Sequence, residues 1–194
     1  MNPQPSNAVV NVPNVLTAAR LALAIVVFVL IPLRLYPPAM VVFILAASTD
    51  WIDGYWARRF GQVTKLGRIF DPFVDKIIIC GTFIFLAAEA GSGILAWMAV
   101  VIMGREMLVT AIRGFIEQQG GDFSASLAGK LKMVFQCVAV VASLLTLQYL
   151  RAMPAAALPS WLVGTLHGSV WLAVLSTIYS GLEYIFAAAR ILRK

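Results

Sequence analysis

Charge is what this 194-residue sequence has least of. Only 12% of its residues are charged, whereas 61% are hydrophobic and the mean hydropathy is +0.88. Roughly 25% of the residues in a typical soluble domain are charged, so we expect a membrane protein. A helix that crosses a bilayer needs roughly 20 mostly apolar residues. The chain therefore has room for about six such helices and little else.

Cysteine and histidine are also scarce. The two cysteines, Cys80 and Cys137, lie in apolar stretches without CxxC or Cys/His spacing, which gives no support for a disulfide framework or a zinc site. The single histidine, His167, lies in the last apolar stretch, and we expect it to be a hydrogen-bonded packing residue. Lys and Arg are absent from the first fifteen residues, so the first apolar segment is expected to be a retained span and not a cleavable signal peptide.

Six apolar stretches, separated by turns and polar residues, predict an all-α chain. Helices are expected because backbone polar groups inside a bilayer must bond to one another. We expect 1–194 to form a single membrane domain, in which 1–13 is a loose amino-terminal segment. The six expected helices are 14–35, 39–59, 66–90, 94–117, 128–150 and 161–190.

The basic residues predict how the chain is oriented. The net charge is +6, and in a membrane protein this favours anionic headgroups and anionic substrates over nucleic acid as partners. With a cytosolic amino terminus, only Arg34 and Arg151 of the fifteen Lys and Arg residues fall in outer loops. Positively charged loops stay in the cytosol, so both termini are expected to be cytosolic.

Four of the nine acidic residues lie near the cytosolic ends of the second and third expected helices: Asp50, Asp53, Asp71 and Asp75. Spacings of three and four place each pair on one helical face, and the short link 60–65 would bring the two faces opposite each other. Carboxylate oxygens favour Mg²⁺ or Mn²⁺, and two such ions could clamp a phosphoryl group during displacement. A set of salt bridges to neighbouring basic residues and a Mg²⁺ transport site are the alternatives.

The neighbours of these aspartates predict a diphosphate site. Gly54 follows Asp53 and Gly67 lies one turn before Asp71, so a bulky ligand could approach the backbone closely. Arg58 lies at the cytosolic edge, where a planar guanidinium can bind a diphosphate through two hydrogen bonds. Helix packing alone is the alternative for the small residues.

The pattern of these residues resembles the signature of the CDP-alcohol phosphotransferase family. The resemblance covers roughly residues 11–135, and within the family it is strongest to bacterial members that use glycerol 3-phosphate as the acceptor alcohol. The matching positions are Asp50, Asp53, Gly54, Ala57, Arg58, Gly67, Asp71 and Asp75, together with 12–17, Arg20, 71–76, 104–106, Arg113 and 129–132.

The resemblance implies a homodimer of six-helix chains in a bacterial cytoplasmic membrane, each chain with a polar cavity open to the cytosol. It implies two divalent ions, Mg²⁺ or Mn²⁺, bound by Asp50, Asp53, Asp71 and Asp75, with Asp75 also the catalytic base. It implies that CDP-diacylglycerol is bound by Asn14, Thr17, Gly54, Arg58, Thr64 and Gly67. The implied reaction transfers the phosphatidyl group to the sn-1 hydroxyl of glycerol 3-phosphate, giving phosphatidylglycerophosphate and CMP.

The acceptor needs a phosphate site, and the fourth and fifth expected helices offer one. Arg105 and Arg113 are two turns apart and could share a cavity-facing stripe with Lys130 and Lys132. The alternative is that these side chains reach the cytosolic interface, and Glu106 could simply neutralise Arg105.

Several other functions stay open at this point. Inositol phosphate, serine or phosphatidylglycerol could replace glycerol 3-phosphate as acceptor with the same chemistry. A Mg²⁺-dependent membrane prenyltransferase also uses aspartate-rich helices, but its two motifs lie far apart, whereas here all four aspartates lie within 26 residues. A Mg²⁺ transporter is the third alternative.

Overall fold

The structure, a computed structural model, describes the backbone of residues 12–60, 65–118, 127–153 and 158–192. Most side chains in these ranges are described as well. Those outside the description belong to 12–14, 16, 50–60, 65–72, 75, 117–118, 127–128, 130 and 191–192.

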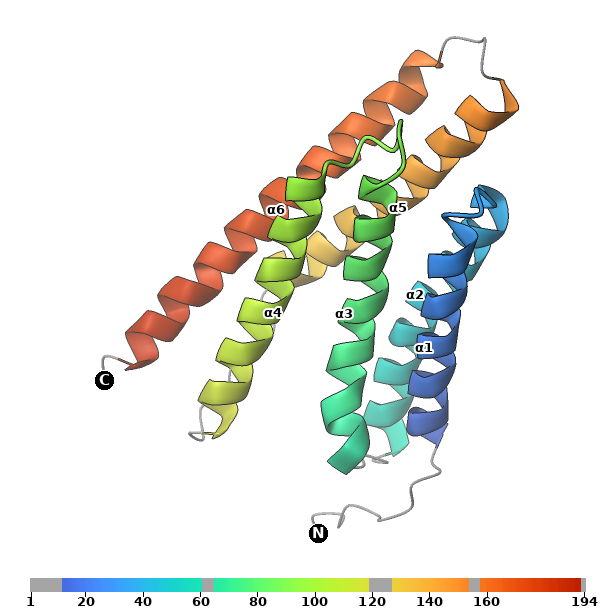
Figure 1. Cartoon of the computed structure of the whole chain (residues 1–194). Coiled ribbons are helices and arrows are strands. Elements are labelled where there is room, and N and C mark those ends of the chain that lie inside the picture. The colour runs from blue at the N-terminus through green and yellow to red at the C-terminus, as the bar shows by residue number, and fades with distance from the viewer. Residues whose placement is uncertain (1–11, 61–64, 119–126, 154–157, 193–194) are drawn as a thin grey trace. The chain divides into compact units, whose positions relative to one another are not determined.

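Every regular element in the described part of the chain is an α-helix, which confirms the expected all-α class (Figure 1). The helices begin and end within a few residues of the expected positions, except at the end of the first. They are α1 (Val12–Leu30), α2 (Tyr36–Phe60), α3 (Lys65–Ala87), α4 (Ala96–Gln118), α5 (Leu127–Ala152) and α6 (Ser160–Leu192).

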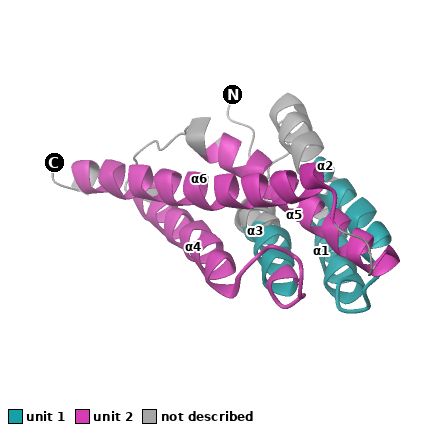
Figure 2. Ribbon diagram, turned by 90° about the horizontal axis from the view of Figure 1, so that it is seen from above, with its two compact units in different colours: residues 1–85 teal, residues 86–194 magenta. Residues whose placement is uncertain are grey.

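The chain divides into two compact units, residues 1–85 and 86–194 (Figure 2). In the first unit, α1 and α2 pack together as a hairpin. The turn between them closes when the backbone N–H of Arg34 donates to the carbonyl of Ile31, at 2.8 Å. Arg34 has a φ of 58°, which a right-handed helix cannot contain, so α1 ends at Leu30 and the prediction of a helix to residue 35 was wrong.

The start of α2 also differs from the expectation. Pro37 and Pro38 lie in its first turn, where proline costs little because the N–H groups there have no partner inside the helix. The two prolines therefore begin the helix, and α2 starts three residues earlier than residue 39.

Close packing joins α3 to α1 within the first unit. A Cβ atom on Gly81 would lie 2.2 Å from Cζ of Phe28, so only glycine lets the ring approach α3 this closely. The same ring stacks on Phe85, with 5.2 Å between the centroids. Ala24 and Val27 of α1 and Phe83 of α3 are also buried.

The second unit is built around α6, which packs against both α4 and α5. The turn before α4 contains Gly91 and Gly93, with φ values of 91° and 73° that favour glycine. Ser92, between them, accepts a hydrogen bond at its carbonyl from the hydroxyl of Ser143 on α5, at 2.8 Å. Gln136 of α5 donates to the hydroxyl of Thr177 on α6, at 3.1 Å.

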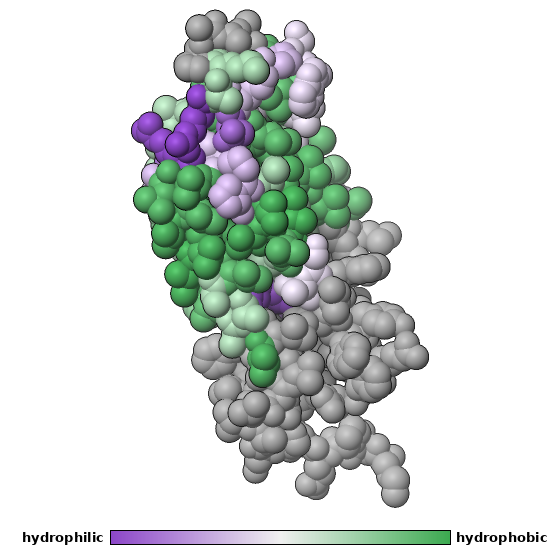
Figure 3. Space-filling model, turned by 90° about the vertical axis from the view of Figure 1, so that its right-hand side faces the viewer, coloured by the Kyte–Doolittle hydropathy of each residue, from purple (hydrophilic) through white to green (hydrophobic). Residues whose placement is uncertain are grey.

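Apolar length and exposed apolar side chains indicate a membrane protein. Among the described residues, two helical segments, Leu131–Ala152 and Ser160–Arg190, are long and apolar enough to cross a bilayer, and three others are shorter. Large hydrophobic side chains are exposed along the helices, for example Val29, Val100 and Leu175. Figure 3 shows one face on which hydrophobic residues form a continuous area and hydrophilic residues gather toward one end. Six crossings stay a prediction.

Candidate functional site

The helices that carry the four aspartates are continuous through the relevant positions. Asp50 and Asp53 lie within α2, and Asp71 and Asp75 lie within α3. Because both stretches are helical, residues three or four positions apart lie on the same helical face. The aspartate side chains are outside the described residues, so whether the two pairs meet stays a prediction.

A divalent metal fits the chemistry of these residues, since carboxylate oxygens are its preferred ligands. Among the side chains that the structure describes, no group of three or more His, Cys, Asp or Glu residues could hold a metal ion. The metal prediction therefore depends entirely on Asp50, Asp53, Asp71 and Asp75.

The residues expected to bind the liponucleotide are described only in part. Gly54 and Arg58 lie within α2, and Gly67 lies within α3. Thr17, on α1, is buried. The side chain of Asn14 and the whole of Thr64 lie outside the described residues.

The second unit brings most of the expected acceptor-phosphate residues together. We use the term basic cluster for Arg105, Glu106 and Arg113 of α4, Lys132 of α5 and Tyr184 of α6. Lys130 belongs to α5, but its side chain is not among those described. The basic cluster thus draws on all three long helices of the second unit.

Glu106 links α4 to α5 inside the basic cluster. Its carboxylate forms a salt bridge with the ammonium of Lys132 and lies 3.5 Å from a terminal nitrogen of Arg105. Both members of the pair are buried, with Glu106 7% and Lys132 5% exposed. The sequence suggested that Glu106 neutralises Arg105, but its main partner is Lys132, which is 26 positions further along the chain.

Tyr184 links α4 to α6 and was not identified from the sequence. Its hydroxyl accepts a hydrogen bond from a terminal nitrogen of Arg113, at 2.8 Å. The guanidinium carbons of Arg105 and Arg113 lie 5.4 Å and 5.6 Å from the centre of its ring. One turn earlier, Gly181 gives Arg105 room to pass α6, because a Cβ there would lie 3.1 Å from Cγ of Arg105. The sequence offered one signal for this contact, a glycine one turn before an aromatic residue on the same helix.

Both arginines have a hydrogen-bond donor without an acceptor among the described residues. The Nε atoms of Arg105 and Arg113 are buried, and no described residue accepts a hydrogen bond from either. Buried donors are nearly always paired, and a guanidinium binds an oxyanion well. Among the described side chains of the basic cluster, three cations are opposed by one carboxylate. This arrangement can bind an anion such as a phosphate.

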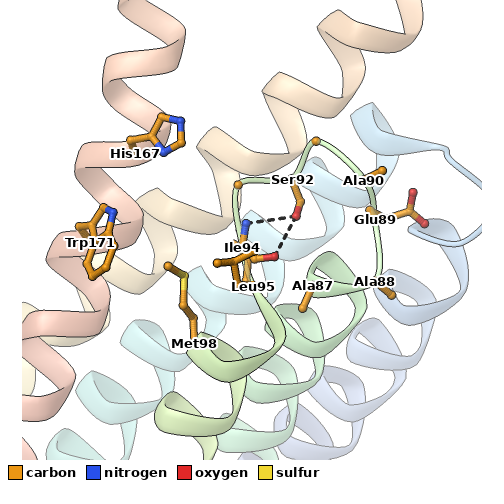
Figure 4. Close-up of a pocket in the computed structure, with 12 residues that line it drawn as sticks. Ala87, Ala88, Glu89, Ala90, Ser92, Ile94, Leu95, Met98, His167 and Trp171 are labelled. Atoms are coloured by element: carbon orange, nitrogen blue, oxygen red, sulfur yellow. Dashed lines mark hydrogen bonds between the residues drawn. The ribbon is translucent and has the colours of Figure 1, made fainter.

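A separate cavity of about 500 Å³ lies beside the turn that precedes α4 (Figure 4). Its lining includes Ser92, Met98, His167 and Trp171, and none of the residues that we expected in the site. The packing role expected for His167 was wrong, because its side chain is exposed and bonds to no residue in the described ranges.

Comparisons with known proteins identify the family. The family model for CDP-alcohol phosphatidyltransferase matches residues 10–179. A Bacillus subtilis (strain 168) protein is 35% identical over 90% of this chain and 93% of its own length. A Pseudomonas fluorescens protein is 33% identical over 92% of this chain and 90% of its own. A protein of Escherichia coli (strain K12) is 33% identical over 67% of this chain and 74% of its own.

All three relatives carry the name CDP-diacylglycerol–glycerol-3-phosphate 3-phosphatidyltransferase. The family match covers most of the chain, and it includes all four aspartates and the basic residues of α4 and α5. This chain belongs to the CDP-alcohol phosphatidyltransferase family.

Proposed function

We propose that the chain transfers the phosphatidyl group of CDP-diacylglycerol to the sn-1 hydroxyl of glycerol 3-phosphate. The products are phosphatidylglycerophosphate and CMP. The names of the three relatives support this choice of substrates. The observation that carries it is the basic cluster, in which the buried Nε atoms of Arg105 and Arg113 have no acceptor among the described residues. An acceptor alcohol that bears a phosphate would supply one.

The aspartates of α2 and α3 would hold the divalent ions. Asp50, Asp53, Asp71 and Asp75 form a set of oxygen ligands suited to Mg²⁺ or Mn²⁺. Two bound ions would supply positive charge that stabilises the phosphoryl oxygens as the reaction proceeds.

In this account the protein's own residues bind both substrates and move one proton. Gly54, Arg58, Thr64 and Gly67, with Asn14 and Thr17, bind the cytidine diphosphate part of the liponucleotide. Asp75 takes the proton of the sn-1 hydroxyl. The acceptor oxygen then forms a bond to the β-phosphorus while the bond from that phosphorus to the CMP oxygen breaks.

The acceptor phosphate is bound by Arg105, Arg113, Lys130 and Lys132. Guanidinium and ammonium groups form short, charge-assisted hydrogen bonds with phosphate oxygens. Lys132 already pairs with Glu106, so its charge is shared between that carboxylate and the ligand. The arginines therefore make the larger contribution.

The two substrates favour one orientation of the chain in the membrane. We propose that all six helices cross the cytoplasmic membrane, with both termini in the cytosol and a polar cavity open to it. The acyl chains of CDP-diacylglycerol then stay in the bilayer while glycerol 3-phosphate enters from the cytosol. We also propose that the chain works as a homodimer.

A CMP-release assay across a panel of acceptors tests the proposed function. Purified protein would be mixed with CDP-diacylglycerol, Mn²⁺ and one acceptor: glycerol 3-phosphate, inositol phosphate, serine or phosphatidylglycerol. We expect CMP only with glycerol 3-phosphate. Release of CMP with only one of the other acceptors would support the proposed reaction but show that the acceptor is not glycerol 3-phosphate. No release with any acceptor would overturn the proposal and favour a transporter.

A further inference from the structure

Tyr184 contacts both arginines of the basic cluster at once. It is 3% exposed, and from α6 it contacts two residues of α4. The two helices pack against each other (Figure 1). Arg105 and Arg113 are eight residues apart, which corresponds to about 12 Å along a helix. Their guanidinium carbons nevertheless both lie within 5.6 Å of the centre of one ring. The two side chains therefore converge on Tyr184.

The contacts to Tyr184 leave the Nε–H group of each guanidinium without an acceptor among the described residues. The ring attracts each cation through its π face, and the hydroxyl accepts one hydrogen bond from Arg113. Neither contact uses the Nε–H groups, which have no acceptor in the described part of the chain. A guanidinium binds an oxyanion through two parallel N–H groups, and the Nε–H can be one of them.

We propose that Tyr184 is a positioning residue, which holds Arg105 and Arg113 in the arrangement that binds the acceptor phosphate. The inference rests on the proposed function, because it concerns the same basic cluster. Arg side chains lose much rotamer freedom when a ligand immobilises them. Tyr184 restrains both arginines before the acceptor arrives, so part of that entropic cost is already met and the acceptor binds more tightly.

The proposal separates the two substrates. Tyr184 acts only through groups that contact the acceptor phosphate, so it should affect the KM for glycerol 3-phosphate. The KM for CDP-diacylglycerol should not change, because the residues proposed to bind it, between positions 14 and 67, belong to the first unit, whereas Tyr184 belongs to the second. A residue needed only for folding would alter both constants together with the thermal unfolding midpoint.

The test compares three variants of the full-length protein. Tyr184→Leu removes the ring and the hydroxyl, and should raise the KM for glycerol 3-phosphate about tenfold, equivalent to about 1.4 kcal/mol. Tyr184→Phe keeps the ring and should raise it only about twofold to threefold, since it loses a single hydrogen bond. Tyr179→Leu, on the same helix but with Tyr179 66% exposed, is the matched control and should leave all constants unchanged.

A fourth variant protects the test against misfolding of Tyr184→Leu. Gly181→Ala places a Cβ atom 3.1 Å from Cγ of Arg105 and leaves Tyr184 in place. It should displace Arg105 and also raise the KM for glycerol 3-phosphate alone. Equal changes in both KM values, or the same effect in Tyr179→Leu, would overturn the inference. So would an unchanged KM for glycerol 3-phosphate in every variant at positions 181 and 184.

Titration calorimetry with inorganic phosphate, without liponucleotide, separates this inference from the proposed function. If the wild-type protein binds phosphate more tightly than Tyr184→Leu does, yet releases no CMP with any acceptor, the positioning role is retained and the proposed function is refuted. If the wild-type protein releases CMP with glycerol 3-phosphate, but Tyr184→Leu binds phosphate as well as the wild type does, the proposed function is retained and the positioning role is refuted. Absence of both phosphate binding and CMP release would overturn both.

Discussion

Glu106 shows how single residues control buried charge in this protein. It is the one carboxylate described in the basic cluster, and it pairs with buried Lys132 across α4 and α5. Removing one member of a buried pair leaves an uncompensated charge, which typically costs 3–5 kcal/mol. Glu106→Gln should therefore destabilise the protein by about 3 kcal/mol, measured as a lower midpoint of thermal unfolding.

The double variant Glu106→Gln, Lys132→Gln provides the matched comparison. Both charges are then absent, so most of the lost stability should return, while glycerol 3-phosphate should bind more weakly than to the wild type because Lys132 is missing. A double variant no more stable than Glu106→Gln would show that the salt bridge is not the cause. An unchanged midpoint in Glu106→Gln would contradict the burial argument.

Asp75 is the residue on which the proposed proton transfer depends. A general base contributes about 10²-fold to 10⁴-fold to a rate, so Asp75→Asn should reduce CMP release at least about 100-fold. Binding of CDP-diacylglycerol should change little, because three other aspartates would still hold metal. Glu89→Gln, in the turn after α3, is the control. Substantial turnover by Asp75→Asn would remove Asp75 from the role of base.

At the scale of the helices, Gly81 controls how closely α1 and α3 approach. The ring of Phe28 occupies the place of a side chain at position 81 and also stacks on Phe85. Gly81→Ala should therefore force the ring to move and destabilise the protein by about 1–3 kcal/mol, as measured by thermal unfolding. Gly164→Ala on α6, where a Cβ would contact no described residue within 4 Å, should be neutral or slightly stabilising.

A further variant identifies the cause of that effect. Adding Phe28→Leu to Gly81→Ala shortens the opposing side chain and should recover part of the stability. If the double variant were less stable than either single variant, the steric explanation would be wrong.

Helices were predictable from the sequence to the extent that local signals control them. Apolar length placed all six, and turn residues placed most of their ends. The end of α1 was missed because it depends on the left-handed backbone of Arg34. Gly and Asn are the residue types that mark such turns in a sequence, and Arg is not. The start of α2 was missed because Pro37 and Pro38 can begin a helix as well as interrupt one.

The candidate site was predictable in its charges but not in its contacts. Arg105, Arg113 and Lys132 stand out because charge in an apolar stretch requires a partner or a function. Tyr184 does not stand out, because aromatic residues are common in such stretches. It meets Arg113 from 71 positions along the chain, a contact that only the packing of α4 on α6 creates.

At the scale of the whole molecule, the proposed orientation can be tested with the protein in its membrane. A variant without Cys80 and Cys137 would receive one new cysteine, by Arg34→Cys or by Gln119→Cys. The positive-inside pattern predicts that Arg34 is outside and Gln119 is cytosolic. A membrane-impermeant maleimide should therefore label Arg34→Cys in intact cells, and Gln119→Cys only after permeabilisation. The opposite pattern would reverse the orientation and separate the site from its cytosolic acceptor.

The central claim is that the acceptor hydroxyl displaces CMP from the β-phosphorus. Glycerol 3-phosphate carrying ¹⁸O at its sn-1 hydroxyl would be incubated with CDP-diacylglycerol, Mn²⁺ and the protein, and both products analysed by mass spectrometry. Our account predicts that the label appears in phosphatidylglycerophosphate and that the CMP is unlabelled. Unlabelled lipid product, or labelled CMP, would contradict it.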